Sequence, residues 1–234
     1  SMQDDRLWLF FVSVSVGGWS GSAINACHSD DGGTTWSEIH RLVCSPFANI
    51  STLVKAPAID LHDGHLLLPV YHEMVSKFPQ LLRIDCSTSH PRVQGVTEIP
   101  GTGDLIQPWL ARGGDGTLLA FLRQTGDRPK HVHLSRSMDN GRTWTAPAAV
   151  DLPNPNASVA AAPLGDGRVL LAYNDTDSGR HNLSLATTAD DGRTWEKIGA
   201  VETKSRRPDE KKERKLEYSY PWLLRTRAGE IHLL

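Results

Sequence analysis

The sequence lacks the long apolar runs and the charge imbalance that mark several classes of protein. No stretch approaches the roughly 18 consecutive apolar residues of a transmembrane helix, so we expect no membrane span. The formal net charge of −2 over 234 residues leaves no electrostatic footprint for nucleic acid or an anionic membrane. The first residues also lack the basic and apolar regions of a signal peptide. These absences favour a soluble protein, with periplasmic, secreted and cytoplasmic locations all open.

Cysteine is scarce, and the pattern of metal ligands is absent. Cys27, Cys44 and Cys86 are odd in number and share no metal-ligand spacing, so we interpret them as buried free thiols. His131 and His133 alternate along one expected strand, but a pair without a third ligand does not define a metal site. We therefore expect no metal and no cofactor.

An eight-residue pattern, Ser/Thr-x-Asp-x-Gly-x-Thr-Trp, occurs three times, at residues 29–36, 137–144 and 188–195. Its aspartates are 108 and 51 residues apart, as if one copy between the first two has decayed. The octet has the chemistry of a hairpin turn. Asp accepts hydrogen bonds from backbone N–H groups ahead of it, Gly supplies a positive φ, and Trp needs an apolar groove with a partner for its N–H. No residue of the octet is a nucleophile, so the repeat predicts fold rather than function.

Between the octets, two apolar runs flanking a short turn with glycine recur, which is a strong hairpin signal. The first strands of the chain are expected over residues 7–12, as a buried strand, and 23–28. The turn glycines of the recurring hairpins are separated by 52, 51 and 62 residues, and four strands in about 50 residues is the anatomy of a β-propeller blade. The longer last interval contains a charged run over 203–215, which we interpret as a solvated loop. The glycines are Gly64, Gly116, Gly167 and Gly229.

We therefore predict an all-β fold, a single propeller domain over residues 1–234 with about four to five blades. Both ends of the chain fall within blades, so we expect the domain to be truncated at both ends. An open propeller exposes sheet edges, and either a longer protein or another chain would complete it.

The three octets match the Asp-box, or bacterial neuraminidase repeat, of the sialidase superfamily. The chain between them resembles the bacterial branch of predicted neuraminidases. The resemblance covers essentially the whole chain and implies a six-bladed sialidase-like propeller, here from the second blade to the start of the sixth. The phrases that carry it are Lys55-Ala56-Pro57, Gln107-Pro108, Leu152-Pro153-Asn154-Pro155-Asn156, Tyr173-Asn174 and Glu217-Tyr218-Ser219-Tyr220-Pro221.

The resemblance also implies a catalytic and binding site. Enzymes of this family hold a substrate carboxylate with arginines, whose planar guanidinium suits that role. The corresponding residues are Arg123, at the end of a hairpin strand, and Arg180, two residues before a strand that enters an octet. The family nucleophile, a Tyr in a Tyr-Ser phrase, corresponds to Tyr218 and needs a base. The family's Glu base, 16 residues before the second Arg, is replaced here by Gln107, an amide that cannot take the proton.

Other polar residues complete the candidate site. Glu217 would substitute as the base, although neighbouring residues of a strand point to opposite faces. Lys55, Asn154, Asn156 and Asn174 suit sugar hydroxyls, and polar turn chemistry explains each Asn almost as well.

Three functions remain open. The first is a sialidase-like glycoside hydrolase acting on an acidic sugar at a chain end, with Tyr218 at the anomeric centre and Gln107 orienting Tyr218 or the substrate. The second is a lyase acting on a uronic acid terminus, which also needs its carboxylate neutralised. The third is a carbohydrate-binding propeller without catalysis. Because the family's first Arg and its Asp acid/base belong to a blade outside this chain, we expect the chain by itself to be inactive.

Overall fold

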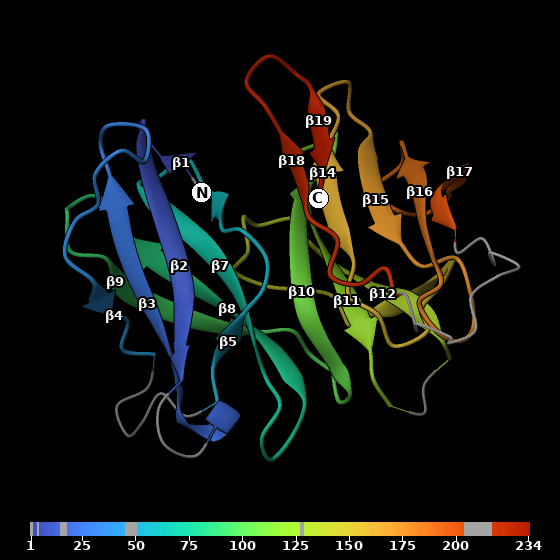
Figure 1. The fold of residues 1–234 in the computed structure, drawn as a ribbon, viewed down its shortest axis with the longest axis horizontal. Helices are drawn as coiled ribbons and strands as arrows, with labels where there is room; N and C mark the ends of the chain where they lie inside the picture. Colours follow the sequence, from blue (N-terminus) through green and yellow to red (C-terminus); the bar gives the residue numbers. More distant parts are fainter. Residues whose placement is uncertain (1, 4, 15–17, 45–50, 127–128, 204–216) are drawn as a thin grey trace, which may run out of the picture.

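The computed structural model describes residues 2–3, 5–14, 18–44, 51–126, 129–203 and 217–234 (Figure 1). The described residues form antiparallel β-sheets and one short 3-10 helix, η1 (Gly18–Gly21). They contain no helix with the length and apolar character of a membrane span.

The strands group into four complete blades and the first hairpin of another. Blade 1 contains β1 (Met2–Gln3), β2 (Arg6–Val14), β3 (Ser22–Ser29) and β4 (His40–Arg41). Blade 2 contains β5 (Leu53–Val54), β6 (Ile59–Asp60), β7 (His65–His72), β8 (Phe78–Asp85) and β9 (Arg92–Glu98). Blade 3 contains β10 (Leu105–Arg112), β11 (Leu118–Gln124), β12 (His131–Ser137) and β13 (Ala148–Pro153). Blade 4 contains β14 (Ala160–Pro163), β15 (Val169–Tyr173), β16 (Asn182–Thr188) and β17 (Glu196–Thr203), and the last hairpin is β18 (Leu223–Arg225) with β19 (Ile231–Leu233).

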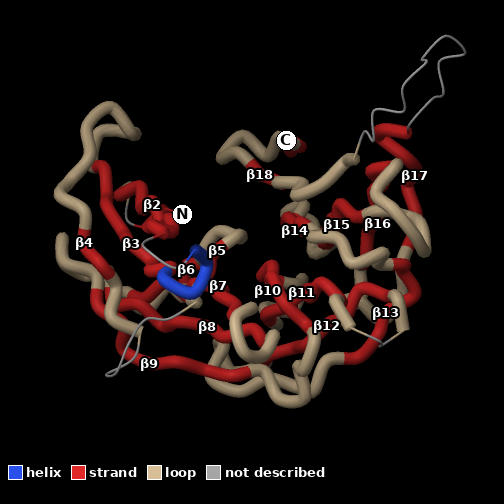
Figure 2. Tube along the Cα trace, turned by 60° about the horizontal axis from the view of Figure 1, so that its bottom comes forward, coloured by secondary structure: helices blue, strands red, loops and turns tan. Residues whose placement is uncertain are grey.

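The blades are arranged as an arc around one axis (Figure 2). The first strands, β5, β6, β10, β14 and β18, lie on the inner side of the arc, and the last strands, β9, β13 and β17, lie on the outer side. Adjacent inner strands contact each other, β10 with β14 and β14 with β18. The arc is open between blade 1 and the last hairpin. The prediction of an incomplete sialidase-like propeller is therefore confirmed.

Each octet forms the turn between the third and fourth strands of its blade. In the octet at 137–144, Asp139 accepts hydrogen bonds from the hydroxyl of Thr143 (2.6 Å), the N–H of Thr143 (2.8 Å) and the hydroxyl of Ser137 (2.8 Å). Asp31 and Asp190 are bound in the same way. The Thr hydroxyl, the Thr N–H and the Ser or Thr hydroxyl lower the pKa of all three aspartates to about 2.

Blade 2 has no octet in its sequence, and its third and fourth strands, β8 and β9, are joined by a different turn. Asp85 begins it and accepts hydrogen bonds from the hydroxyl (2.6 Å) and the N–H (3.0 Å) of Ser87. Asp85 accepts from the residue two positions ahead, whereas Asp139 accepts from the residue four positions ahead, so blade 2 has a different turn at this place.

The octet tryptophans pack on the blade that precedes their own. Trp144 of blade 3 joins a cluster with Leu61 and Leu67 of blade 2 and donates its N–H to the carbonyl of Gly141 (3.2 Å). Trp195 of blade 4 meets Phe121 of blade 3 edge-on, with ring centres 5.9 Å apart. Trp36 of blade 1 is 42% exposed, because no blade precedes blade 1 in the described structure. The expectation of an apolar groove is therefore wrong for Trp36.

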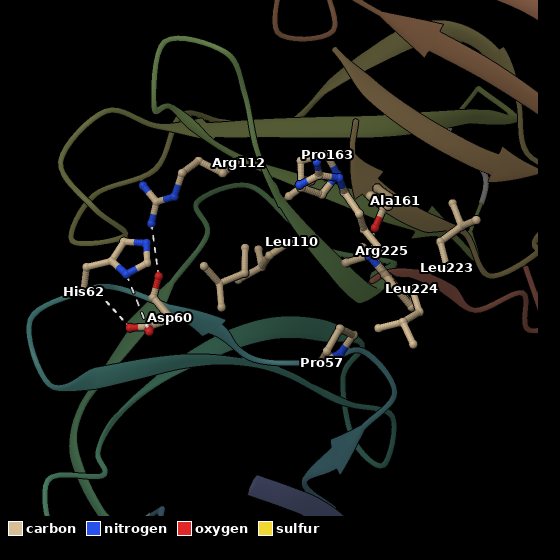
Figure 3. Close-up of a pocket in the computed structure, with 14 residues that line it drawn as sticks. Pro57, Asp60, His62, Leu110, Arg112, Ala161, Pro163, Leu223, Leu224 and Arg225 are labelled. Atoms are coloured by element: carbon tan, nitrogen blue, oxygen red, sulfur yellow. Dashed lines mark hydrogen bonds and ion pairs between the residues drawn. The ribbon is translucent and has the colours of Figure 1, made fainter. Parts of the chain in front are cut away.

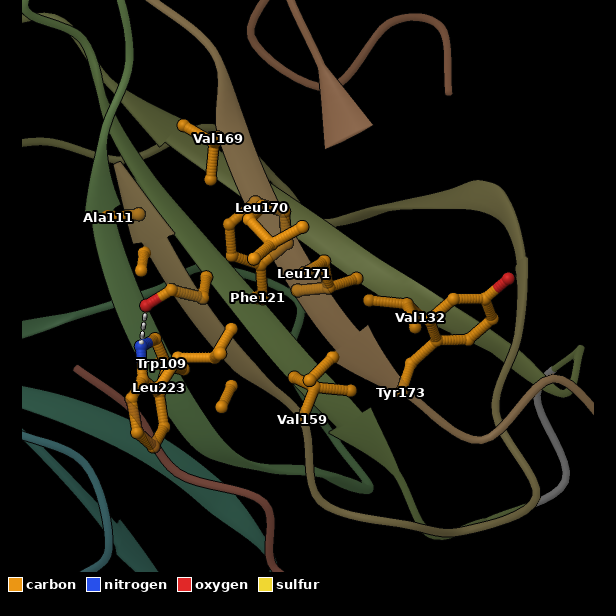
Figure 4. Packing of buried hydrophobic residues seen from close by; sticks show 14 of the residues in the cluster. Trp109, Ala111, Phe121, Val132, Val159, Val169, Leu170, Leu171, Tyr173 and Leu223 are labelled. Atoms are coloured by element: carbon orange, nitrogen blue, oxygen red, sulfur yellow. Dashed lines mark hydrogen bonds between the residues drawn. The ribbon is translucent and has the colours of Figure 1, made fainter. Parts of the chain in front are cut away.

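The hydrophobic core lies between consecutive blades. Figure 4 shows the cluster between blades 3 and 4, where Trp109, Phe121, Leu171 and Tyr173 pack together. At the open end, the strand predicted as buried over 7–12 is buried on one face only. Trp8 packs on blade 2, whereas Leu9 on the other face is 44% exposed.

Two further sequence predictions concern smaller features. All three cysteines are free, Cys27 and Cys86 in the interior and Cys44 half-buried. Of the charged run predicted as a loop over 203–215, only Thr203 falls within the described residues, and it ends β17.

The octet glycine gives a testable measure of how tightly blades stack. Gly33 and Gly141 occupy the same octet position, with φ of 95° and 83°. A Cβ on Gly141 would lie 2.6 Å from Cδ2 of Leu67 in blade 2, whereas a Cβ on Gly33 would meet nothing closer than 3.6 Å. We expect both alanine variants to lose about 1–2 kcal/mol from the positive φ, and Gly141→Ala to lose about 1–3 kcal/mol more from overpacking. Chemical denaturation of the two variants measures the difference, and equal losses would contradict close blade stacking at Gly141.

The octet aspartates predict acid sensitivity. Each has a pKa near 2 in the folded protein and an ordinary value of 3.8, so the unfolded chain binds more protons between these values. Stability should therefore be retained above pH 4 and fall as the pH falls towards 2. Asp139→Asn should be less stable at pH 7 and lose less over the same range, as followed by urea denaturation at several pH values. A slope equal to that of the unmutated chain would refute this origin.

Candidate functional site

The turn glycines align the blades and define two sets of equivalent positions along the axis. Nine residues before each turn glycine lie Lys55, Gln107, Ser158 and Tyr220, at the beginning of the inner strands. Seven residues after the first three turn glycines lie Tyr71, Arg123 and Asn174, at the end of the second strands. Because inner and second strands are antiparallel, both sets lie at the same end of the propeller axis.

Gln107 lies in a β-bulge of the inner strand β10. The register of β10 with β11 shifts between Ile106 and Trp109, and Gln107 has a φ of 51° before Pro108. A bulge redirects a side chain out of the regular alternation of the strand. The buried amide of Gln107 donates from Nε2 to the hydroxyl of Tyr71 (3.3 Å) and accepts at Oε1 from Arg123 (3.0 Å). Both ends of the amide are thus occupied by residues of two different blades.

Asn156 joins the two arginines that the sequence predicts as carboxylate ligands. Its side-chain oxygen accepts from Nε of Arg123 (2.8 Å), and its backbone oxygen accepts from Nη2 of Arg180 (2.8 Å). Asn156 has a φ of 60° in the loop before β14, a conformation that Asn tolerates better than most residues. The loop therefore places two guanidinium groups from blades 3 and 4 on either side of one residue.

Arg180 also contacts the segment that leads into the last hairpin. Its Nη1 donates to the hydroxyl of Ser219 (3.2 Å) and lies 3.8 Å from the carboxylate of Glu217. We call the connected set of Tyr71, Gln107, Arg123, Asn156, Arg180, Glu217 and Ser219 the polar arc. The structure thus brings five sequence-predicted residues together, and it adds Tyr71 and Ser219.

Sequence analysis alone missed Tyr71, although a signal was present. Tyr71 stands seven residues after its turn glycine, as Arg123 does one blade later. Tyr220 was missed for the same reason. Tyr220 stands at the blade position equivalent to that of Gln107. Like Gln107, it has a positive φ (58°) and is followed by a proline. It is 53% exposed.

Tyr218 lies beside the polar arc rather than in its hydrogen-bond network. Its half-buried side chain packs against the core cluster of blades 3 and 4. Its backbone N–H donates to the carbonyl of Arg180 (2.8 Å), and its carbonyl accepts from Nδ2 of Asn174 (3.0 Å). Asn174 is 1% exposed, so the structure places it beneath the segment that carries Tyr218.

Asn154 lies in the interior, and Lys55 is half-buried. The ammonium of Lys55 donates to the carbonyls of Pro221 (2.8 Å) and Val159 (3.1 Å) and lies 4.2 Å from the ring centre of Trp109. Lys55 of blade 2 thus connects blades 3 and 4 and the last hairpin. Burial lowers the pKa of Lys55 to about 7, while the carbonyls and the ring face favour its charged form. Asn154 is fully buried, and its amide closes the loop through Ala157.

A cavity of about 500 Å³ lies at the other end of the inner strands (Figure 3). It is lined by Leu110 and Arg112 at the end of β10 and by Leu223 and Arg225 of β18. None of the predicted site residues lines it. Nor do the described residues contain a cluster of three or more His, Cys, Asp or Glu side chains able to hold a metal ion. Five of the nine predicted site residues therefore lie in the polar arc, and the other four lie outside it.

Comparisons with known proteins agree with this architecture. A family model described as the BNR repeat-like domain matches residues 1–233. The Hadza microbial sialidase Hz136 superimposes with a TM-score of 0.66 at 18% identity, over 93% of this chain and 45% of that one. The intramolecular trans-sialidase from Ruminococcus gnavus, in complex with oseltamivir carboxylate, gives 0.65 at 19% identity over 91% and 45%. The GH43_1 enzyme from Xanthomonas citri, complexed with xylose, gives 0.63 at 13% identity over 86% and 71%.

These likenesses establish the fold. The chain spans less than half the length of the two sialidase structures. No curated protein sequence matches it.

Lys55 provides a test of the connection across the axis. Lys55→Met keeps the aliphatic stem but leaves the carbonyls of Val159 and Pro221 without a donor, and we expect a loss of about 1–3 kcal/mol. The exposed Lys130→Met is the matched control, with an expected change within about 0.5 kcal/mol. Because the folded-state pKa of Lys55 is lowered, the unmutated chain should gain stability as the pH rises above 7, and Lys55→Met should lose that gain. Urea denaturation at pH 7 and pH 9 measures both effects; equal behaviour of the two variants would contradict them.

Proposed function

Because the chain belongs to the BNR repeat-like domain family, we propose that its polar arc binds the carboxylate of an acidic sugar and that the protein is a sialidase-like glycoside hydrolase. The observation that carries the proposal is the pair of arginines from adjacent blades, Arg123 and Arg180, joined through Asn156. A carboxylate is the ligand that best matches two such guanidinium groups.

Both guanidinium groups keep donors for a ligand. Arg123 uses one N–H on Asn156 and one on Gln107, and Arg180 uses one on Asn156 and one on Ser219. Each arginine carries five N–H donors, so the majority are left for other acceptors. The ion pair of Arg180 with Glu217 is long, at 3.8 Å, and the Glu217 side chain is 53% exposed. An exposed pair of this kind is weak, so an incoming carboxylate would compete with it successfully.

The other candidate residues have different roles in this proposal. Tyr218 would act at the anomeric centre after a change of side-chain orientation, with the neighbouring Glu217 as its base. Gln107 orients Arg123 and Tyr71 and does not take a proton. Asn154 and Asn174 support the loops of the site from the interior, and the half-buried Lys55 holds two backbone carbonyls.

A second candidate function is carbohydrate binding without turnover. The specific observation in its favour is Gln107, because an amide occupies the place of the family's carboxylate base and both of its ends are already bound. The similar solved structures hold ligands of different charge. The R. gnavus enzyme is in complex with oseltamivir carboxylate, and the X. citri enzyme is in complex with neutral xylose. The charge of the sugar is therefore the first property to test.

The test is titration of the chain with N-acetylneuraminic acid and with its neutral methyl ester, followed by NMR. We expect binding of the acid only. Arg123→Met and Arg180→Met should each weaken it about 10- to 100-fold, since each removes a charge-assisted contact. Arg168→Met is the control, because Arg168 pairs with Asp166 at a hairpin turn. Equal binding of acid and ester, or no effect of the two arginine variants, would refute carboxylate recognition.

Turnover by the full-length protein separates the remaining possibilities, because the chain by itself is expected to be inactive. Release of a fluorogenic aglycone from an N-acetylneuraminide would support the hydrolase, and new absorbance from an unsaturated uronate would support the lyase. Binding without either product, unchanged by Tyr218→Phe, would favour the binding module.

A further inference from the structure

We propose that Tyr71 is a further ligand-binding residue of this site, whose hydroxyl donates a hydrogen bond to a sugar oxygen on the carbon next to the carboxylate. The inference rests on the proposed function, because the carboxylate must first be held by the arginines. It assigns a residue to the site and narrows the ligand to acids that carry such an oxygen.

The direction of each hydrogen bond follows from the chemistry of the three side chains. A guanidinium can only donate, so the end of the Gln107 amide that faces Arg123 must be its oxygen. The other end, the NH₂ group, therefore faces Tyr71 and donates to it. The oxygen of Tyr71 is the acceptor in this contact, and its own proton is left to be donated elsewhere. Arg123 thus sets the polarity of Tyr71 through Gln107.

Tyr71 is largely buried, and its hydroxyl already accepts one hydrogen bond. Its side chain is 8% exposed and packs with Leu53, Ile106 and Val12. Within the described part of the chain, Gln107 is its only hydrogen-bond partner. The hydroxyl proton is therefore available to an oxygen of a bound ligand. Burial raises the pKa of Tyr71, with smaller contributions of the same sign from Glu73 and Tyr220, so the hydroxyl keeps its proton at neutral pH.

The shared amide also fixes what kind of ligand fits. Arg123 and Tyr71 bind opposite ends of one amide group, so the two side chains lie close to each other. A carboxylate held by Arg123 would bring an oxygen of the adjacent carbon towards Tyr71. The ring oxygen of an acidic sugar is in that position, whereas a simple aliphatic acid has no acceptor there.

The equivalence of blade positions places Tyr71 and Arg123 at the same level of neighbouring blades. Tyr71 is the counterpart in blade 2 of Arg123 in blade 3, and both stand at the same end of the axis. The position that supplies the charged ligand contact in one blade thus supplies a neutral donor in the preceding blade.

The experiment is a double-mutant cycle on the affinity of the full chain for N-acetylneuraminic acid. Tyr71→Phe should weaken binding about fivefold, the value of one neutral hydrogen bond. In Gln107→Glu, the carboxylate accepts the Tyr71 proton, so adding Tyr71→Phe to that variant should have no further effect on affinity. The cycle cancels the effect of the added charge on the acidic ligand. Tyr173→Phe is the control, because Tyr173 lies in the hydrophobic core. The affinity of this variant for N-acetylneuraminic acid should be unchanged.

The outcomes are distinguishable. If the unmutated chain binds no acidic sugar, or if Arg123→Met binds as well as it does, the proposed function fails and this inference fails with it. If arginine-dependent binding is present but Tyr71→Phe binds equally well, the role of Tyr71 alone is refuted. If Tyr71→Phe costs the same affinity in both backgrounds, the contribution of the Tyr71 hydroxyl does not depend on Gln107, and the proton direction assigned to Tyr71 is refuted. Thermal unfolding of each variant verifies that it is folded.

Discussion

A propeller blade has two faces, and both need a neighbouring blade to cover them. Most of the structure follows from this constraint. Each octet tryptophan covers the preceding blade, as Trp144 does over Leu67, and the octet glycine must be bare because the neighbouring leucine lies against it. Where a neighbour is absent from the described structure, the same kinds of residue are exposed, as Trp36 and Leu9 are in blade 1. The octet turn thus contributes to the stacking of blades as well as to the hairpin.

The same stacking brings the beginnings of the inner strands together at one end of the axis. The chain there adopts conformations that regular strands avoid, with positive φ at Gln107, Asn156 and Tyr220. These distortions aim polar side chains across blade boundaries instead of along a sheet. Lys55 shows the result most directly, because one ammonium group holds carbonyls from two other parts of the arc. The framework of the site is therefore made of contacts between blades.

The electrostatics of the polar arc explain why it suits an anion. Among the described residues, Arg123 has no carboxylate as a hydrogen-bond partner, since Gln107 and Asn156 are both amides. Within the same part of the chain, the one carboxylate contact of Arg180 is the long one with Glu217. Amide partners orient a guanidinium without cancelling its charge, so the positive potential remains available to a ligand. A glutamate in place of Gln107 would reduce this potential and reverse the hydrogen bond to Tyr71.

The sequence by itself determined the all-β class, the blade spacing and the octet turns, because these depend on local chemistry: the Asp–Thr hydrogen bonds, the turn glycines and the alternation of short apolar strands. It also indicated Gln107, Arg123, Asn156, Arg180 and Glu217, which do converge. Only the tertiary structure decided which polar residues face the site and which lie in the interior. Lys55, Asn154 and Asn174 look as suitable for a sugar as Asn156 does, yet all three hold backbone carbonyls: Lys55 over the ring of Trp109, Asn154 within its own loop and Asn174 in the segment that carries Tyr218. Tyr71 looks like a core residue in the sequence, and its role depends on an amide contributed by the next blade. The direction of a hydrogen bond between blades has no signature in the local sequence, because it is set by residues that only stacking brings into contact.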